Sequence, residues 1–221
     1  MESEVIKNVP VVVYAESTPN PAAMKFVANK ILLEGSIPLE FFSAADAKSS
    51  PLVTELFKFP FVKSVFISGN YITVFKTDKV EWDDIMLELR EFLRTHLSEG
   101  KKITGPTQTL PFREGFDSPE QRAKVVGDLP AGQAVLEGAI DHVEPKGELE
   151  VKIVNILEQY IRPAVEQDGG MIVFRSFKDG IVSLTMRGAC SGCPSSTSTL
   201  KGGIEALLKK FIPEVKSVVS E

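Results

Sequence analysis

Two cysteines in a short glycine-rich stretch are the residues of this chain best suited to chemistry. Cys190 and Cys193 lie in GACSGCPSS (188–196), hereafter the cysteine segment, and they are the 2 cysteines among 221 residues. A strand is expected before this segment and a helix from Pro194 onward, so the segment is a turn. The start of a helix carries partial positive charge, which favours thiolates. The neighbouring glycines allow the backbone to bend closely around whatever the two sulfurs hold.

Four interpretations of this pair differ in what the sulfurs do. Packing of two small apolar side chains does not explain the paired spacing. A redox dithiol fits a CxxC between a strand and a helix, although only one short strand follows. A zinc site needs four ligands, and the 2 histidines, His96 and His142, are far away in sequence. An iron–sulfur cluster also needs four thiolates, which two chains together would supply. Composition and spacing leave the redox dithiol and the cluster site both open.

The elements that must position the cysteines follow the order α-β-β-α-β in the C-terminal part. A helix within 147–170 is expected to bury one side of its surface. That side holds Ile153, Leu157, Tyr160, Ile161 and Ala164. The remaining expected elements are strands 171–177 and 181–187, a helix over 194–212 and a strand over 215–220. The string Asp168-Gly169-Gly170 could point a carboxylate at the site, but a helix C-terminal cap is the favoured interpretation.

The N-terminal part shows a separate set of elements. Extended runs are expected at 11–14, 24–33 and 37–43, and a hairpin over 61–77 turns at Gly69-Asn70. A short helix is expected over 49–59, capped by Ser50 with Pro51 in its first position. A longer amphipathic helix is expected over 82–97, with His96 on its apolar side.

These patterns predict an α+β protein of two small domains joined by a long linker. The predicted divisions are an N-terminal domain over 1–100, a linker over 101–146 and a C-terminal domain over 147–221. The linker begins with a stretch rich in Gly, Pro, Thr and charged residues, and its strong elements are few.

Composition excludes several classes of function. The formal net charge is −5, from 25 Lys+Arg and 30 Asp+Glu, which argues against nucleic-acid binding. No apolar run reaches the roughly 20 residues of a membrane span. The first residues, MESEVIKNVP, lack the features of a secretory signal or transit peptide, so a cytoplasmic location is expected. No nucleophile–base pair, phosphate loop or carboxylate pair stands out, so no enzyme is expected.

The stretch from QYIRPAV (159–165) through GACSGCPSS to the final PEVKSV resembles the C-terminal domain of NifU, the Nfu-type iron–sulfur carrier. TPNPAAMKF (18–26) and SPLVTELFKFPFVKSVFISGNYITVFK (50–76) resemble the Nfu N-terminal domain. The resemblance implies a protein that binds a [4Fe-4S] cluster and passes it to apo-proteins. It implies Cys190 and Cys193 as the iron ligands.

The resemblance also implies partners. These are apo iron–sulfur client proteins and upstream cluster-assembly proteins, and the N-terminal domain is expected to recognise one of them. Because one chain offers two thiols, cluster binding is expected to require a homodimer. A dithiol–disulfide oxidoreductase is the alternative from another class.

Overall fold

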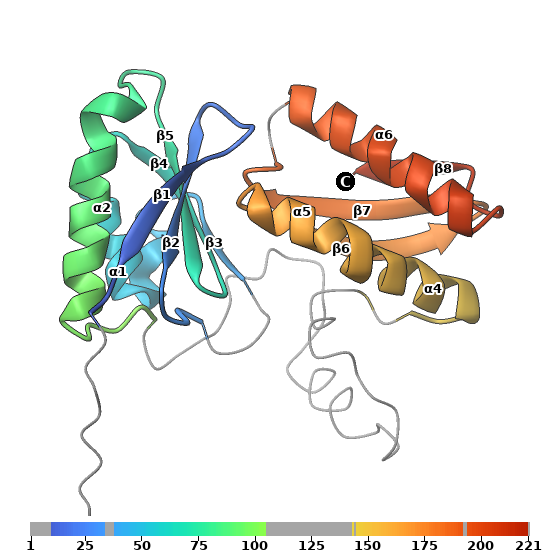
Figure 1. Ribbon diagram of the computed structural model, residues 1–221, viewed down its shortest axis with the longest axis horizontal. Helices are drawn as coiled ribbons and strands as arrows, with labels where there is room; N and C mark the ends of the chain where they lie inside the picture. Colours follow the sequence, from blue (N-terminus) through green and yellow to red (C-terminus); the bar gives the residue numbers. More distant parts are fainter. Residues whose placement is uncertain (1–9, 34–37, 105–142, 144, 192–193, 221) are drawn as a thin grey trace, which may run out of the picture.

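The computed structural model of the chain describes residues 10–33, 38–104, 143, 145–191 and 194–220, with the side chains of 194–197 left aside. These residues form two α+β domains, each built on its own sheet (Figure 1). The fold class is therefore the predicted one. Cys193, His142 and most of the predicted linker lie outside the described residues. No helix in the described ranges is both long and apolar enough to span a membrane.

The N-terminal domain holds a five-stranded antiparallel sheet. Its strands in chain order are β1 (Val13–Ser17), β2 (Ala23–Ala28), β3 (Leu39–Phe41), β4 (Val62–Ser68) and β5 (Tyr71–Lys76). In space the order is β1-β2-β5-β4-β3. The predicted hairpin is confirmed as β4–β5, and Gly69 takes the positive φ of 50° that its tight turn requires.

Helices cover one face of this sheet. They are η1 (Asp46–Ser49), α1 (Pro51–Leu56) and α2 (Trp82–Ser98). Ser50 caps α1 by accepting a hydrogen bond from Val53 N at 3.3 Å, as predicted. The apolar side of α2 is buried as its 3.6-residue period requires, and His96 is buried with it. The core between helices and sheet includes Phe26, Leu52, Ile67, Val74, Leu89 and Leu93.

The C-terminal domain confirms the predicted α-β-β-α-β order. A helical run of α4 (Glu148–Ile156), η2 (Leu157–Ile161) and α5 (Arg162–Gln167) leads into β6 (Gly170–Lys178) and β7 (Ile181–Gly188). Then follow α6 (Pro194–Phe211) and β8 (Ser217–Ser220). β6 and β7 pair antiparallel, and β8 lies parallel beside β7. The helices pack on one face of this sheet over Ile172, Phe174, Val182 and Leu184.

The first helical run of this domain differs from the prediction in its phase. A π-helical turn occupies Leu157–Ile161, just before Pro163. Proline has no N–H for the carbonyl one turn earlier, so the helix widens there. The wider turn shifts the buried side by one residue. Val165 therefore faces the core in place of Ala164, and Tyr160 is exposed.

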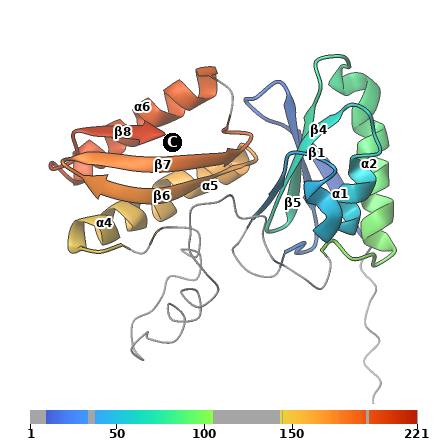
Figure 2. The same ribbon diagram turned by 180° about the vertical axis from the view of Figure 1, so that it is seen from behind.

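The two domains contact each other through the sheet face that α1 and α2 leave uncovered. Figures 1 and 2 show the C-terminal domain against this face, on the side opposite to α2. Phe66 and Tyr71 form a small buried cluster with Met171 and Val173 of β6. Since side chains alternate along a strand, β6 sends Met171 and Val173 to the N-terminal domain. Ile172 and Phe174 point to the helices of its own domain.

Candidate functional site

The cysteine segment begins where β7 ends. Gly188 closes the strand with φ 63°, and Ser191 folds back on it: its N–H and its hydroxyl donate to Gly188 O at 2.9 and 2.8 Å. Helix α6 begins at Pro194, as predicted. The structure therefore describes the first cysteine of the pair and the start of the helix, while Cys193 between them stays outside the described residues.

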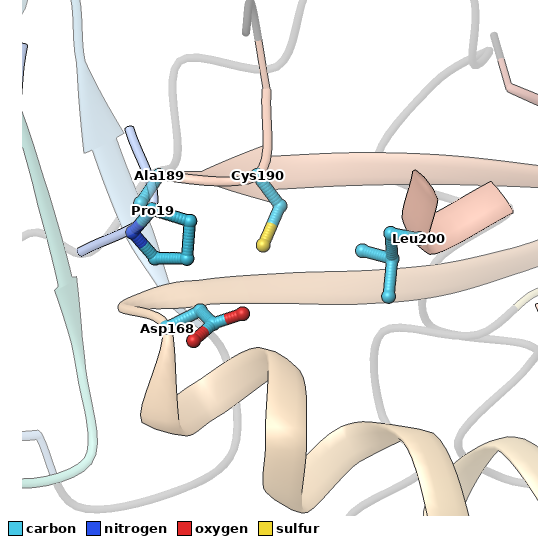
Figure 3. A pocket seen from close by; sticks show the side chains of 5 residues that line it. All are labelled: Pro19, Asp168, Ala189, Cys190 and Leu200. Carbon is cyan, nitrogen blue, oxygen red and sulfur yellow. The ribbon is translucent and has the colours of Figure 1, made fainter. Parts of the chain in front are cut away.

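Cys190 is buried at the junction of the two domains. Its residue is 4% exposed, and its sulfur points into a small pocket lined by Pro19, Asp168, Ala189 and Leu200 (Figure 3). The cavity volume is about 30 Å³, which is room for about one water molecule. The sulfur that is expected to bind iron thus lies under cover in this structure, and part of that cover, Pro19, comes from the N-terminal domain.

Burial sets the protonation state of this thiol. Loss of solvent raises the pKa of Cys190 to about 12, and the nearby Asp168 carboxylate adds to the rise. The same burial raises the pKa of Asp168. The expectation that the helix start favours a thiolate is therefore wrong for Cys190 in this arrangement, because desolvation outweighs the helix. Cys190 is a protonated thiol here at neutral pH.

Glycines permit the close approach of the strands around Cys190. A Cβ on Gly170 would lie 2.7 Å from Cys190 Sγ and 2.8 Å from Arg187 O. Gly169 ends α5 with φ 76°, and its N–H donates to Glu166 O at 3.0 Å. The helix-cap interpretation of Asp168-Gly169-Gly170 is confirmed by this geometry. The Asp168 side chain also lines the pocket of Cys190, so this carboxyl group lies near the sulfur as well as at the helix end.

Three residues of the N-terminal domain reach the cysteine segment, and the sequence did not single them out. Besides Pro19, the Asn20 side chain donates from Nδ2 to Ala189 O at 3.2 Å. The carboxylate of Glu40 accepts a hydrogen bond from Gly188 N at 3.3 Å. Pro19 and Asn20 lie in a turn, and Glu40 is a single acidic residue on a short strand, so no hydrophobic periodicity in the sequence indicates what these three residues contact. Only the tertiary fold brings them to the cysteines.

The histidines give the site no further ligand in the described part of the chain. His96 is buried on α2, on the far side of the sheet from Cys190, with Nε2 3.5 Å from Lys102 O. Burial lowers its pKa. Within the described ranges, no three His, Cys, Asp or Glu side chains are grouped so that they could hold a metal ion.

Comparison with known proteins places both domains in families. Residues 13–100 match the family described as scaffold protein Nfu/NifU N terminal, and residues 153–219 match the NifU-like domain. A human protein named NFU1 iron-sulfur cluster scaffold homolog, mitochondrial, is 33% identical over 93% of this chain and 70% of its own length.

Two further relatives show the same pattern. A protein of the same name from Drosophila willistoni is 33% identical over 93% of this chain and 62% of its own length. The NifU-like protein C1709.19c of Schizosaccharomyces pombe is 35% identical over 93% of this chain and 70% of its own length. The matches thus span most of this chain and between 62% and 70% of these relatives. On this evidence the chain belongs to the Nfu-type family of NifU-like proteins.

Proposed function

We propose that this protein carries an iron–sulfur cluster of the [4Fe-4S] type between two subunits and transfers it to apo-proteins. Cys190 and Cys193 of each subunit are the proposed iron ligands. The observation that carries the proposal is the glycine-lined turn that puts Cys190 between β7 and the start of α6 in a NifU-like domain. The relatives named as iron–sulfur cluster scaffolds support the same role.

The number and kind of donor atoms support a shared cluster. Thiolates are soft ligands that suit iron–sulfur clusters, and a cubane needs about four of them. The chain has 2 cysteines, so two chains supply the full set. A cluster held across a symmetric contact is released when that contact opens, which is what transfer requires. The protein acts as a binding partner in this scheme and needs no catalytic group of its own.

A dithiol–disulfide oxidoreductase is the second candidate, and the state of Cys190 disfavours it. The attacking sulfur of such an enzyme needs a lowered pKa and access to solvent. Cys190 is buried, and its pKa is raised to about 12. The closed arrangement excludes a cluster as well, so the candidates differ in the proton: iron displaces it on binding, whereas disulfide exchange needs the thiolate beforehand.

Anaerobic reconstitution with iron and sulfide tests the proposal. We expect absorption and Mössbauer spectra of a [4Fe-4S] cluster with about four irons per two chains. Cys190→Ala and Cys193→Ala should each abolish binding, because each removes two ligands from the dimer. Ser191→Ala is the matched control, since it lies between the ligands and offers no sulfur. A disulfide cycle that proceeds without iron, with no cluster formed, would favour the oxidoreductase instead.

Partners and location belong to the same proposal. The proposed partners are apo iron–sulfur proteins as recipients, assembly proteins as donors and a second copy of the chain on cluster binding. The proposed location is the cytoplasm, while several relatives carry the word mitochondrial in their names. Cell fractionation with an antibody to the native chain decides between these compartments.

A further inference from the structure

The uncovered sheet face of the N-terminal domain carries three polar side chains that donate hydrogen bonds to backbone carbonyls of the C-terminal domain. Thr73, which is fully buried, donates from its hydroxyl to Gly169 O at 2.8 Å. The Tyr71 hydroxyl donates to Gly170 O at 3.0 Å. Lys25 Nζ donates to Gln167 O at 3.3 Å. A cation at this place complements the partial negative charge at the end of the α4–α5 helical run.

The same domain holds the backbone next to Cys190. Asn20 donates to Ala189 O and Glu40 accepts from Gly188 N, so the two residues that precede Cys190 are both held by the N-terminal domain. Asn20 is itself held, because its Oδ1 accepts a hydrogen bond from Ala22 N at 3.0 Å. Pro19, one residue earlier, covers the cysteine pocket. We call the set Lys25, Tyr71, Thr73, Asn20 and Glu40 the docking residues.

One carbonyl group links the two sets of contacts. Gly169 O accepts from Thr73 of the N-terminal domain and also from Ala189 N, at 3.1 Å, in the cysteine segment. The approach is close enough to demand glycine, since a Cβ on Gly169 would lie 2.9 Å from Thr73 Oγ1. A Cβ on Gly188 would lie 3.1 Å from the ring of Phe66. Gly169 and Gly188 therefore approach this face more closely than a side chain at either position would allow.

The interface is specific but modest. Its buried apolar cluster contains four side chains, with the partly buried Val27 and Phe75 packed against it. Five side chains of the N-terminal domain form hydrogen bonds to backbone groups of the C-terminal domain. Each domain buries a larger core of its own, which does not depend on the contact. Where polar contacts make up much of an interface between domains of one chain, relative motion of the domains is the default expectation. Opening would uncover Cys190 without unfolding either domain.

We infer that the N-terminal domain is a reversible cover for the cluster site, and that its docking residues must release the cysteine segment before a cluster can bridge two chains. The bridging part of this inference rests on the proposed function, whereas the docking does not. A pocket the size of one water molecule, with Cys190 4% exposed, leaves no room for a [4Fe-4S] cluster at this sulfur. The occupant of the docking face is the chain's own C-terminal domain.

Thiol labelling of the iron-free chain tests the cover. In the full chain carrying Cys193→Ser, the labelling rate of Cys190 by a thiol reagent reports how often the cover opens. Tyr71→Phe with Thr73→Val removes two hydroxyls that bind the C-terminal domain and preserves the shape of both side chains. We expect labelling to become about tenfold faster, because each lost hydrogen bond favours the open form.

A matched control makes the same chemical changes away from the interface. Tyr14→Phe with Thr95→Val alters two exposed positions of the N-terminal domain and should leave the rate unchanged. Glu40→Ala is a second opening variant, to be used if the first does not fold by circular dichroism. Equal labelling rates in folded parent and opening variants would overturn the inference. A parent rate that falls as protein concentration rises would also overturn it, because the cover would then come from a second copy.

Cluster loading separates this inference from the proposed function. With both cysteines present, the opening variant should take up iron and sulfide several times faster than the parent. Faster labelling together with absence of a cluster in every variant would contradict the proposed function and leave the docking intact. Normal cluster formation together with an unchanged labelling rate of Cys190 in the opening variant would contradict only the inference that the N-terminal domain covers the site.

Discussion

Gly170→Ala tests whether the backbone around Cys190 is as tightly packed as the structure shows. The added methyl carbon would lie 2.7 Å from Cys190 Sγ, 2.8 Å from Arg187 O and 3.0 Å from Cys190 N. Carbon atoms in good contact lie about 3.5–4.0 Å from their neighbours, so the strand pair or the cysteine segment must move by roughly 1 Å. Two of the three obstacles are backbone atoms, which cannot turn away as a side chain can.

The expected cost is that of overpacking, about 1–3 kcal/mol in the free energy of unfolding of the C-terminal domain. With a urea slope of about 2 kcal/mol per molar, a loss of about 2 kcal/mol lowers the unfolding midpoint by about 1 M. Far-UV circular dichroism follows the C-terminal domain together with the rest of the chain. Fluorescence of Trp82, the only tryptophan, follows the N-terminal domain and should shift less.

Gly203→Ala is the matched control for this substitution. Gly203 is an exposed helical glycine of α6, and a Cβ there meets nothing within 4 Å. Alanine should stabilise this position by about 0.5–1 kcal/mol. The reasoning is refuted if Gly170→Ala is as stable as the parent, or if both alanine variants shift the midpoint in the same direction.

Three further predictions follow from buried groups. Leu184→Ala, at a fully buried position of β7, should lower the free energy of unfolding of the C-terminal domain, followed by circular dichroism, by about 2–5 kcal/mol. The unfolding midpoint of the N-terminal domain, followed by Trp82 fluorescence, should move less. Equal shifts in both signals would contradict separate folding of the two domains. Gly169→Ala, at φ 76° and against Thr73, should speed labelling of Cys190, which an unchanged rate would contradict. Burial lowers the pKa of His96, so the unfolded chain binds a proton at this residue more readily than the folded chain does. The free energy of unfolding should therefore fall as the pH drops below 6.5, the ordinary pKa of histidine. His96→Gln should reduce this pH dependence in urea titrations at successive pH values.

The sequence was sufficient for the local elements because their signals are local. The turn at Gly69-Asn70, the cap at Ser50 and the apolar side of α2 are set by neighbours within a few residues. The helical run before the cysteines was predicted without its π-helical turn, since the period alone does not show how Pro163 is accommodated. Its consequence, the burial of Val165, could not be read from the spacing.

The assignment of Cys190 and Cys193 as iron ligands stays a prediction, and the burial of Cys190 by the N-terminal domain was not predicted. Strand β2 runs Ala23–Ala28 with nearly every residue buried, which is typical of a strand covered on both faces. This burial is a property of the folded chain, and the sequence of β2 does not say which segment provides the second layer. Lys25 and Thr73 look like surface residues in sequence, and they are buried because carbonyls from residues 167 and 169 meet them. The raised pKa of Cys190 has the same tertiary origin.

Anaerobic sedimentation of the reconstituted protein is the most direct test of whether one cluster is held between two chains. Absorbance of the cluster in the visible range and absorbance of the protein are recorded in the same run, and iron and sulfide are assayed on the recovered material. We predict that all cluster absorbance sediments as a dimer with about four irons per two chains, while iron-free protein sediments as a monomer. Cluster absorbance that sediments with a single chain would contradict it.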